Sequence, residues 1–145
     1  YSSGDRWTLH LCNEGRDVSS RLAALVEDSH SSVRSEFGGR NRVGALPGAD
    51  VSGLPLLLTE CGGIDMGSFS EEDFSFGNLA ETPEALAARM REIVTDIRSI
   101  EALKGFVWTQ LADVQQEING LLYFDRQPKF PIAVFGDIFS KEGEV

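Results

Sequence analysis

Short apolar runs alternate along this chain with stretches in which apolar residues recur at helical spacing. The runs lie at 7–11, 54–59 and 105–110. Apolar runs of this length are typical of strands, and the uninterrupted run at 54–59 favours a strand buried on both faces of a parallel sheet. We expect this strand to end at Glu60, because Cys61 and two glycines follow.

A helical pattern follows each run. Asp17 is a suitable N-cap for the first helix and Thr82 for the second, where Pro83 takes the first helical position. The apolar stripe of the second helix is Leu86, Met90, Ile93, Val94 and Ile97. A last helix is predicted at about 132–139. The segments 29–53 and 64–81 are predicted to be long loops, since Ser and Gly are frequent in them.

The order strand, helix, strand, helix, strand, helix indicates three successive βα units and therefore a parallel sheet. A small doubly wound sheet and a piece of a (β/α)8 barrel both fit this order. No Gly-rich turn opens the first helix, as a nucleotide-binding doubly wound fold would require. Long loops after the strands favour the barrel, so residues 1–145 are interpreted as part of an α/β TIM barrel that needs further strands to close.

Composition narrows the possible partners. The formal net charge is -10, and an acidic surface repels phosphate backbones, so we expect no nucleic acid partner. No apolar run is long enough to cross a membrane and no signal peptide is visible, so no membrane partner is expected either. The cysteines, Cys12 and Cys61, are too few for a disulfide framework, which favours reduced thiols and a cytoplasmic protein.

Glu60 is the strongest candidate for chemistry. It directly follows an apolar strand, where a carboxylate is costly unless it is used or paired. A structural ion pair with an arginine is the alternative. Trp108, on the next strand, could stack on a sugar ring or pack in the core. His10 could hydrogen-bond a substrate hydroxyl, whereas His10 and Cys12 are too few ligands for a metal site. We expect no metal and no cofactor.

Three segments together resemble glycoside hydrolase family 2, the β-galactosidase and β-glucuronidase family. Residues 55–64 (PLLLTECGGI) are similar to its seventh barrel strand, and residues 105–114 (GFVWTQLADV), with 116–120 and 125–129 after them, to its eighth strand and the following loop. Residues 5–10 (DRWTLH) are similar to the sixth strand. The resemblance therefore implies the last three βα units of a catalytic barrel, with the remaining strands expected upstream.

The resemblance implies a retaining β-glycosidase that acts on a carbohydrate substrate. Glu60 matches the nucleophile, Trp108 the floor of the sugar subsite, and His10 the sixth-strand histidine. The family's acid/base is a Glu after an Asn at the end of the fourth strand, and no such strand is present. The pair Asn13-Glu14 lies beyond the sixth-strand match and is interpreted as coincidence. We therefore expect that this piece alone hydrolyses nothing at a useful rate.

The chain also departs from the family. Relatives often follow the sixth-strand histidine with Asp-Tyr, and here Leu11-Cys12 stand in those places. A non-catalytic carbohydrate-binding or remnant module is thus the alternative to the enzyme. An unrelated small α/β domain is the third hypothesis. A serine hydrolase is disfavoured, because residues 67–70 (GSFS) lack the Gly-x-Ser-x-Gly pattern.

Overall fold

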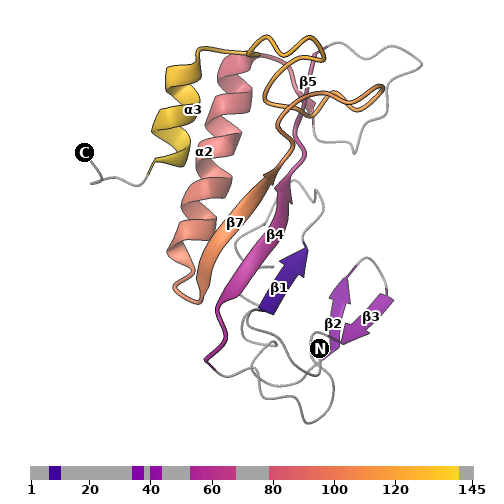
Figure 1. The fold of residues 1–145 in the computed structure, drawn as a ribbon, viewed down its shortest axis with the longest axis vertical. Helices are drawn as coiled ribbons and strands as arrows, with labels where there is room; N and C mark the ends of the chain where they lie inside the picture. Colours follow the sequence, from indigo (N-terminus) through magenta and orange to yellow (C-terminus); the bar gives the residue numbers. More distant parts are fainter. Residues whose placement is uncertain (1–6, 11–33, 38–39, 44–52, 68–78, 141–145) are drawn as a thin grey trace.

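The computed structural model describes residues 7–10, 34–37, 40–43, 53–67 and 79–140, with side chains for 53–67 and 79–140 (Figure 1). In chain order the strands are β1 (Trp7–His10), β2 (Arg34–Phe37), β3 (Arg40–Val43), β4 (Leu56–Gly62), β5 (Asp65–Met66), β6 (Leu79–Ala80) and β7 (Leu103–Thr109). The helices are α2 (Pro83–Ser99) and α3 (Ile132–Phe139). The helix predicted from Asp17 lies outside the described residues.

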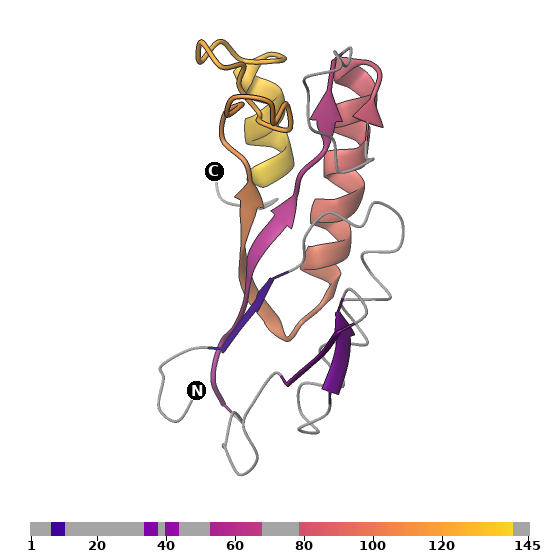
Figure 2. The same cartoon turned by 90° about the vertical axis from the view of Figure 1, so that its right-hand side faces the viewer.

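A parallel three-stranded sheet forms the centre of the described fold. Its order is β1-β4-β7, and β4 pairs in parallel with both neighbours. The three predicted strands and their parallel arrangement are confirmed. Figures 1 and 2 show α2 and α3 beside this sheet, and both pack against the same face of β7. The other face of β7 carries no helix among the described residues.

The central strand differs from its prediction in length and burial. β4 continues past Glu60 to Gly62 and begins only at Leu56. Leu56 and Leu58 are 3% and 0% exposed, but Leu57 is half-buried and Thr59 is exposed. The expectation of burial on both faces was therefore wrong in the described structure, since α2 covers only the face that carries Leu56 and Leu58.

Both predicted loops contain short strands. β2 and β3 pair antiparallel within 29–53, with Arg34 opposite Val43 and Phe37 opposite Arg40. Gly38-Gly39 separates them in the sequence, a pair typical of two-residue hairpin turns. β5 and β6 form a two-residue parallel pair within 64–81. The loop prediction was wrong at these places because polar residues form the strands of the hairpin and only two-residue contacts form the second pair.

Helix α2 begins where the sequence predicts. The Thr82 side chain accepts a hydrogen bond of 3.1 Å from the Ala85 backbone N–H, and Pro83 takes the first helical position, where no N–H is needed. The buried face of the helix consists of Leu86, Ala87, Met90, Val94 and Ile97. The predicted stripe is confirmed apart from Ile93, which is half-buried and packs at the margin of the core.

Helix α3 has the predicted bounds and packs against α2. Ile138 joins the core of α2, and the rings of Phe130 and Phe135 lie 4.2 Å apart at the start of α3. At the other end, the Arg98 guanidinium of α2 donates a hydrogen bond of 2.8 Å to the Phe139 carbonyl. The two helices are thus fixed to each other at both ends.

The cap of α2 provides a test of this description. Thr82→Ala removes the oxygen that accepts from Ala85 N–H. We expect a loss of about 1 kcal/mol in the free energy of unfolding, measured by urea denaturation. Thr82→Ser keeps the oxygen and should change the stability by only a few tenths of that amount. Equal losses in both variants would contradict a capping role.

Candidate functional site

An extra residue in β4 decides which of its side chains face the helices. Leu58 pairs with Phe106 and Cys61 pairs with Trp108, so three steps along β4 match two steps along β7. The same insertion appears on the other side, where Leu9 pairs with Leu58 but His10 pairs with Glu60. Because both neighbouring strands show the shift, the bulge belongs to β4.

The bulge directs Glu60 away from the helices. Leu58 and Cys61 both pack with Ile97 of α2, so both lie on the helix-covered face. In a regular strand Glu60 would share the face of Leu58, because side chains alternate with a period of two. With the extra residue, Cys61 takes that buried place and Glu60, its neighbour, lies on the opposite face. Glu60 is half-buried there, at the carboxyl end of the central strand.

His10 and Glu60 lie next to each other across the sheet. The register of β1 and β4 pairs the two residues at the carboxyl ends of both strands. Two of the three predicted site residues are therefore brought together in the backbone. A substrate contact of His10 stays a prediction.

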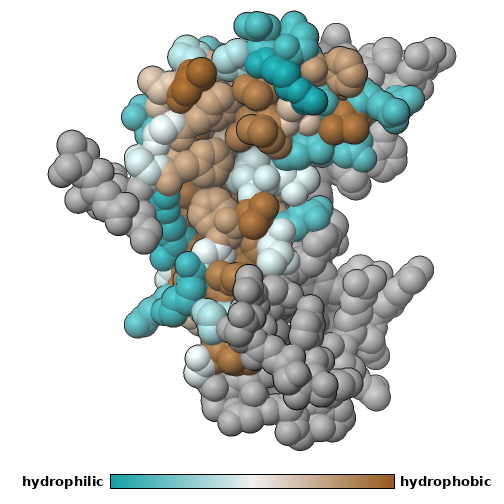
Figure 3. Space-filling view, in the orientation of Figure 1, coloured by the Kyte–Doolittle hydropathy of each residue, from teal (hydrophilic) through white to brown (hydrophobic). Residues whose placement is uncertain are grey.

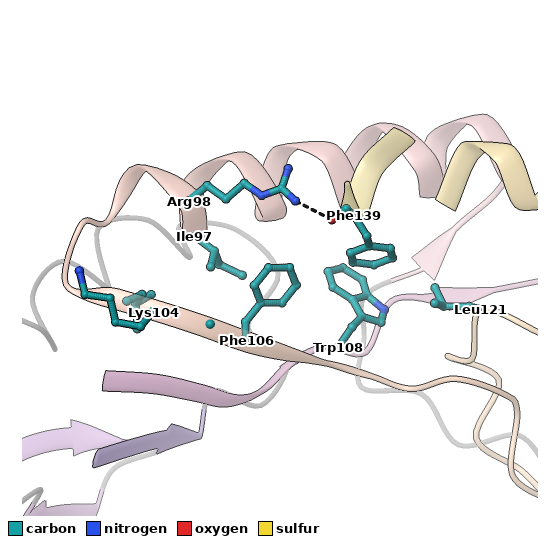
Figure 4. A pocket seen from close by; sticks show the side chains of 9 residues that line it. Ile97, Arg98, Lys104, Phe106, Trp108, Leu121 and Phe139 are labelled. Carbon is teal, nitrogen blue, oxygen red and sulfur yellow. Dashed lines mark hydrogen bonds between the residues drawn. The ribbon is translucent and has the colours of Figure 1, made fainter. Parts of the chain in front are cut away.

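Trp108 lies on the helix-covered face, opposite that of Glu60. Its ring meets the Phe139 ring edge-on at 5.7 Å, and Phe106 lies beside it at 6.2 Å from Phe139 (Figure 4). These residues line a pocket of about 680 Å³ between β7 and the two helices. Figure 3 shows apolar residues gathered over this region. The structure does not bring Trp108 together with Glu60, and its sugar contact stays a prediction.

Gly62 explains why the segment after Glu60 needs glycine. A Cβ at Gly62 would lie 2.6 Å from the Trp108 ring and 2.8 Å from the Thr109 carbonyl oxygen, and its φ of 104° is one that other residues rarely adopt. The sequence suggested that this glycine admits a ligand. In the structure it admits the Trp108 ring, which supports the end of β4 from the helix side.

The thiol of Cys61 is held in its neutral form. It is 2% exposed, and the thiol donates a hydrogen bond of 3.4 Å to the Val107 carbonyl. Burial, with the nearby negative charge of Glu60 as the second cause, raises the pKa of Cys61 to about 12. Cys61 is therefore a packing residue rather than a nucleophile.

A buried ion pair organises the loop that follows β7. Lys129 Nζ lies 2.8 Å from Asp113 Oδ1, and it also donates a bond of 2.6 Å to the Ile118 carbonyl. The Lys129 side chain is 0% exposed and that of Asp113 is 8% exposed. The same carboxylate oxygen accepts a bond of 2.8 Å from Gly120 N–H. Three parts of the loop therefore meet at Asp113.

Gly120 and Asn119 extend this network to the end of β7. A Cβ at Gly120 would lie 2.3 Å from the Asp113 backbone nitrogen, so only glycine fits. Asn119 is 3% exposed, and its side-chain oxygen accepts a bond of 2.6 Å from Gln110 Nε2. The sequence analysis quoted these residues only within the resemblance. The available signal was polar residues at fixed places in a loop that must be buried.

Two further observations concern metals and membranes. Within 53–67 and 79–140, no three His, Cys, Asp or Glu side chains gather as a metal site would require. Among the helices of the described chain, neither α2 nor α3 has the length and apolar character needed to cross a bilayer.

The ion pair can be tested by removing its cation. Lys129→Met leaves the Asp113 carboxylate buried without its partner, which we expect to cost about 3–5 kcal/mol in the free energy of unfolding. Lys104→Met is the matched control, because the exposed Lys104 ammonium bonds only the Glu101 carbonyl. Chemical denaturation of both variants measures the difference. A change below about 0.5 kcal/mol for Lys129→Met, the size of a surface substitution, would contradict the role of the pair.

The protonation of Cys61 predicts its reactivity. In a Cys12→Ser background, we expect the folded protein to resist iodoacetamide at pH 8, because the attacking thiolate forms only near the raised pKa. Denaturation at the same pH should restore labelling to the rate of an exposed thiol. Mass spectrometry of the labelled protein measures both rates, and fast labelling of the folded form would contradict the burial.

The described fold is similar to part of several solved structures. A GH2 β-galacturonidase from Eisenbergiella tayi bound to galacturonate matches 90% of this chain and 22% of its own, with 18% identity and a TM-score of 0.53. The same enzyme bound to glycerol matches 90% and 22%, with 17% identity and a TM-score of 0.50. A β-glucuronidase from Ruminococcus gnavus in complex with D-glucuronic acid matches 59% and 16%, with 22% identity and a TM-score of 0.43.

These likenesses concern the fold. No family model matches the sequence, and no curated protein matches it. The chain spans less than a quarter of the length of the solved structures it resembles. The small α/β fold of the described residues is therefore similar to a part of GH2 enzymes.

Proposed function

We propose that this chain is the nucleophile-bearing part of a retaining β-glycosidase of glycoside hydrolase family 2. The observation that carries the proposal is the bulge in β4, which turns Glu60 out of the apolar core at the carboxyl end of the central parallel strand. Bulges next to active sites often redirect a side chain in this way. Active sites of (β/α)8 barrels lie at the carboxyl ends of the strands.

The partial barrel is the second element of the proposal. Val107 lies between Phe106 and Trp108 on β7, so it faces away from the helices, and it is 56% exposed. Leu57 is half-buried and flanked by the helix-facing Leu56 and Leu58. A face of branched apolar residues opposite the helices suits the packed interior of a barrel. The GH2 enzyme from Eisenbergiella tayi supports this assignment, since its fold includes the described elements in a much longer chain.

Glu60 would act as the nucleophile. Its carboxylate attacks the anomeric carbon and displaces the leaving group, which takes a proton from a second carboxylic acid about 5–5.5 Å away. Water then releases the sugar from the covalent ester. Asp113 is unsuited to be that acid, because Lys129 and Gly120 already hold its carboxylate. We place the acid on the upstream part of the barrel.

His10 and Trp108 complete the proposed sugar site. His10 would hydrogen-bond a sugar hydroxyl beside Glu60, in keeping with their register. The sugar contact proposed for Trp108 comes from the family resemblance alone. Its packing under Gly62 provides a second role, which is to support the strand end that carries Glu60. We further propose a cytoplasmic enzyme that is β-galactosidase-like in its chemistry.

A non-catalytic carbohydrate-binding or remnant module is the alternative. Asp113 is occupied by its own ion pair, and the only Asn-Glu sequence, Asn13-Glu14, does not match the family's acid. A module of this kind would keep sugar binding at the strand ends without turnover. The intact mass of the native gene product bears on the choice, because a mass far above 15.9 kDa would provide room for the remaining strands.

The decisive experiment compares Glu60→Gln with Glu101→Gln in the native gene product. Glu101 is exposed at the opposite end of β7 and is the matched control. We expect Glu60→Gln to lower kcat on aryl β-glycosides by roughly 10³-fold or more, and Glu101→Gln to leave it unchanged. A 2-deoxy-2-fluoro glycoside should label the peptide that contains Glu60. Sugar binding without turnover in the unmodified protein would favour the alternative, and turnover by Glu60→Gln would refute the proposed nucleophile.

A further inference from the structure

The end of β7 holds a polar side chain that the proposed chemistry does not use. We propose that Gln110 binds a hydroxyl of an uncharged sugar and so determines the substrate class. This inference rests on the proposed glycosidase function and deepens it. It is carried by the position of Gln110, by the way its amide is held, and by the charge around it.

Gln110 lies at the same edge of the sheet as Glu60. It directly follows β7, and the preceding Thr109 carbonyl accepts a bond of 2.6 Å from Gly63 N–H on the segment after β4. Since Cys61 pairs with Trp108, Gln110 lies about three residues beyond the level of Glu60. At the rise of a strand this is roughly 10 Å. Such a spacing leaves room for one sugar ring between a carboxylate at the anomeric carbon and an amide at a distant hydroxyl.

The Gln110 amide is fixed before any ligand binds. Its Nε2 donates a bond of 2.6 Å to the buried Asn119, and its backbone carbonyl accepts one of 3.0 Å from Leu121 N–H. No described residue donates to its side-chain oxygen, and Gln110 is only partly buried. A half-exposed acceptor with a fixed orientation suits a hydroxyl donor, because little side-chain entropy remains to be lost on binding.

The loop beneath Gln110 is built to keep this orientation. Asn119 precedes Gly120, whose N–H is bonded to Asp113, and Asp113 is in turn bonded to the buried Lys129. Each member of this chain of contacts is at most 6% exposed or is a glycine in a place where no side chain fits. The position of the amide therefore follows from the folded loop.

The charge at this end of the strands favours an uncharged sugar. Lys129 is the cation closest in the sequence to the Asn119-Gly120 pair, and its side chain is fully buried against Asp113. The segment 63–82 after β4 contains no Lys or Arg, and its acidic residues are Asp65, Glu71, Glu72, Asp73 and Glu81. A uronate carboxylate would meet this negative charge, whereas a neutral hydroxyl would not.

The test uses the native gene product with an aryl β-glycoside, the matching aryl β-uronide and a set of monodeoxy glycosides. We expect the glycoside to be cleaved faster than the uronide. Gln110→Ala should lower kcat/KM on the glycoside about 10- to 100-fold, as loss of one hydrogen bond to a partly buried group would do. The loss should vanish on the one deoxy glycoside that lacks the bound hydroxyl. Gln116→Ala, at an exposed glutamine of the same loop, is the control.

Each outcome bears on the proposal. Gln110→Glu, which keeps the shape of the side chain, should show the same selective loss if the neutral amide is needed, and thermal unfolding of every variant separates binding from folding. An equal loss on all deoxy glycosides, no loss in Gln110→Ala, or preference for the uronide would overturn the inference while Glu60→Gln still abolishes turnover. Activity that survives Glu60→Gln would instead overturn the proposed function.

Discussion

The extra residue in β4 is the constraint on which the candidate site depends. A strand that packs one face under a helix must keep its apolar residues in step with that helix, and β4 does so up to Leu58. At Thr59 the alternation changes, so Cys61 rather than Glu60 meets Ile97. One inserted residue thus separates a carboxylate from an apolar core only one position away. The rest of the strand end follows, including the glycine that must pass the Trp108 ring.

Two kinds of core hold this arrangement. Beneath the sheet, apolar side chains of α2 and α3 pack against β7 and provide most of the buried area. Beyond the end of β7, the loop 110–130 is organised by buried polar groups that all converge on Asp113. An ion pair of this kind contributes less to stability than to the selection of one arrangement, because removing its charges from water is costly. The apolar core therefore fixes the sheet and the polar core fixes the loop conformation.

Local patterns were sufficient to predict the elements that depend on local physics. The apolar run at 54–59 and the Thr82-Pro83 start of α2 carry their structure in neighbouring residues, and both were found. The hairpin of β2 and β3 was missed, since its residues are polar and only the pairing of the two strands stabilises it. The order of the strands followed from the alternation of elements.

The site was predictable in part. Glu60 and His10 could be placed at one end of a parallel sheet, because strands of a βα unit end at the same edge. The face of Trp108 could not be predicted, since the bulge that fixes the relation of β4 to β7 depends on contacts with both neighbouring strands. The Asp113–Lys129 contact joins residues 16 positions apart across an irregular loop, and no periodicity reports such a contact.

The hydrogen bond from Arg98 to Phe139 has a consequence for the electrostatics of the two helices. Each helix returns antiparallel to the strand before it, so α2 and α3 run in the same direction and end near each other. The negative ends of two helix dipoles are then side by side, which is unfavourable. Arg98 lies in the last turn of α2 and bonds the last carbonyl of α3, so one guanidinium offsets both partial charges. A fold of repeated βα units creates this repulsion at every neighbouring pair of helices, and a cation shared between their ends is an economical remedy.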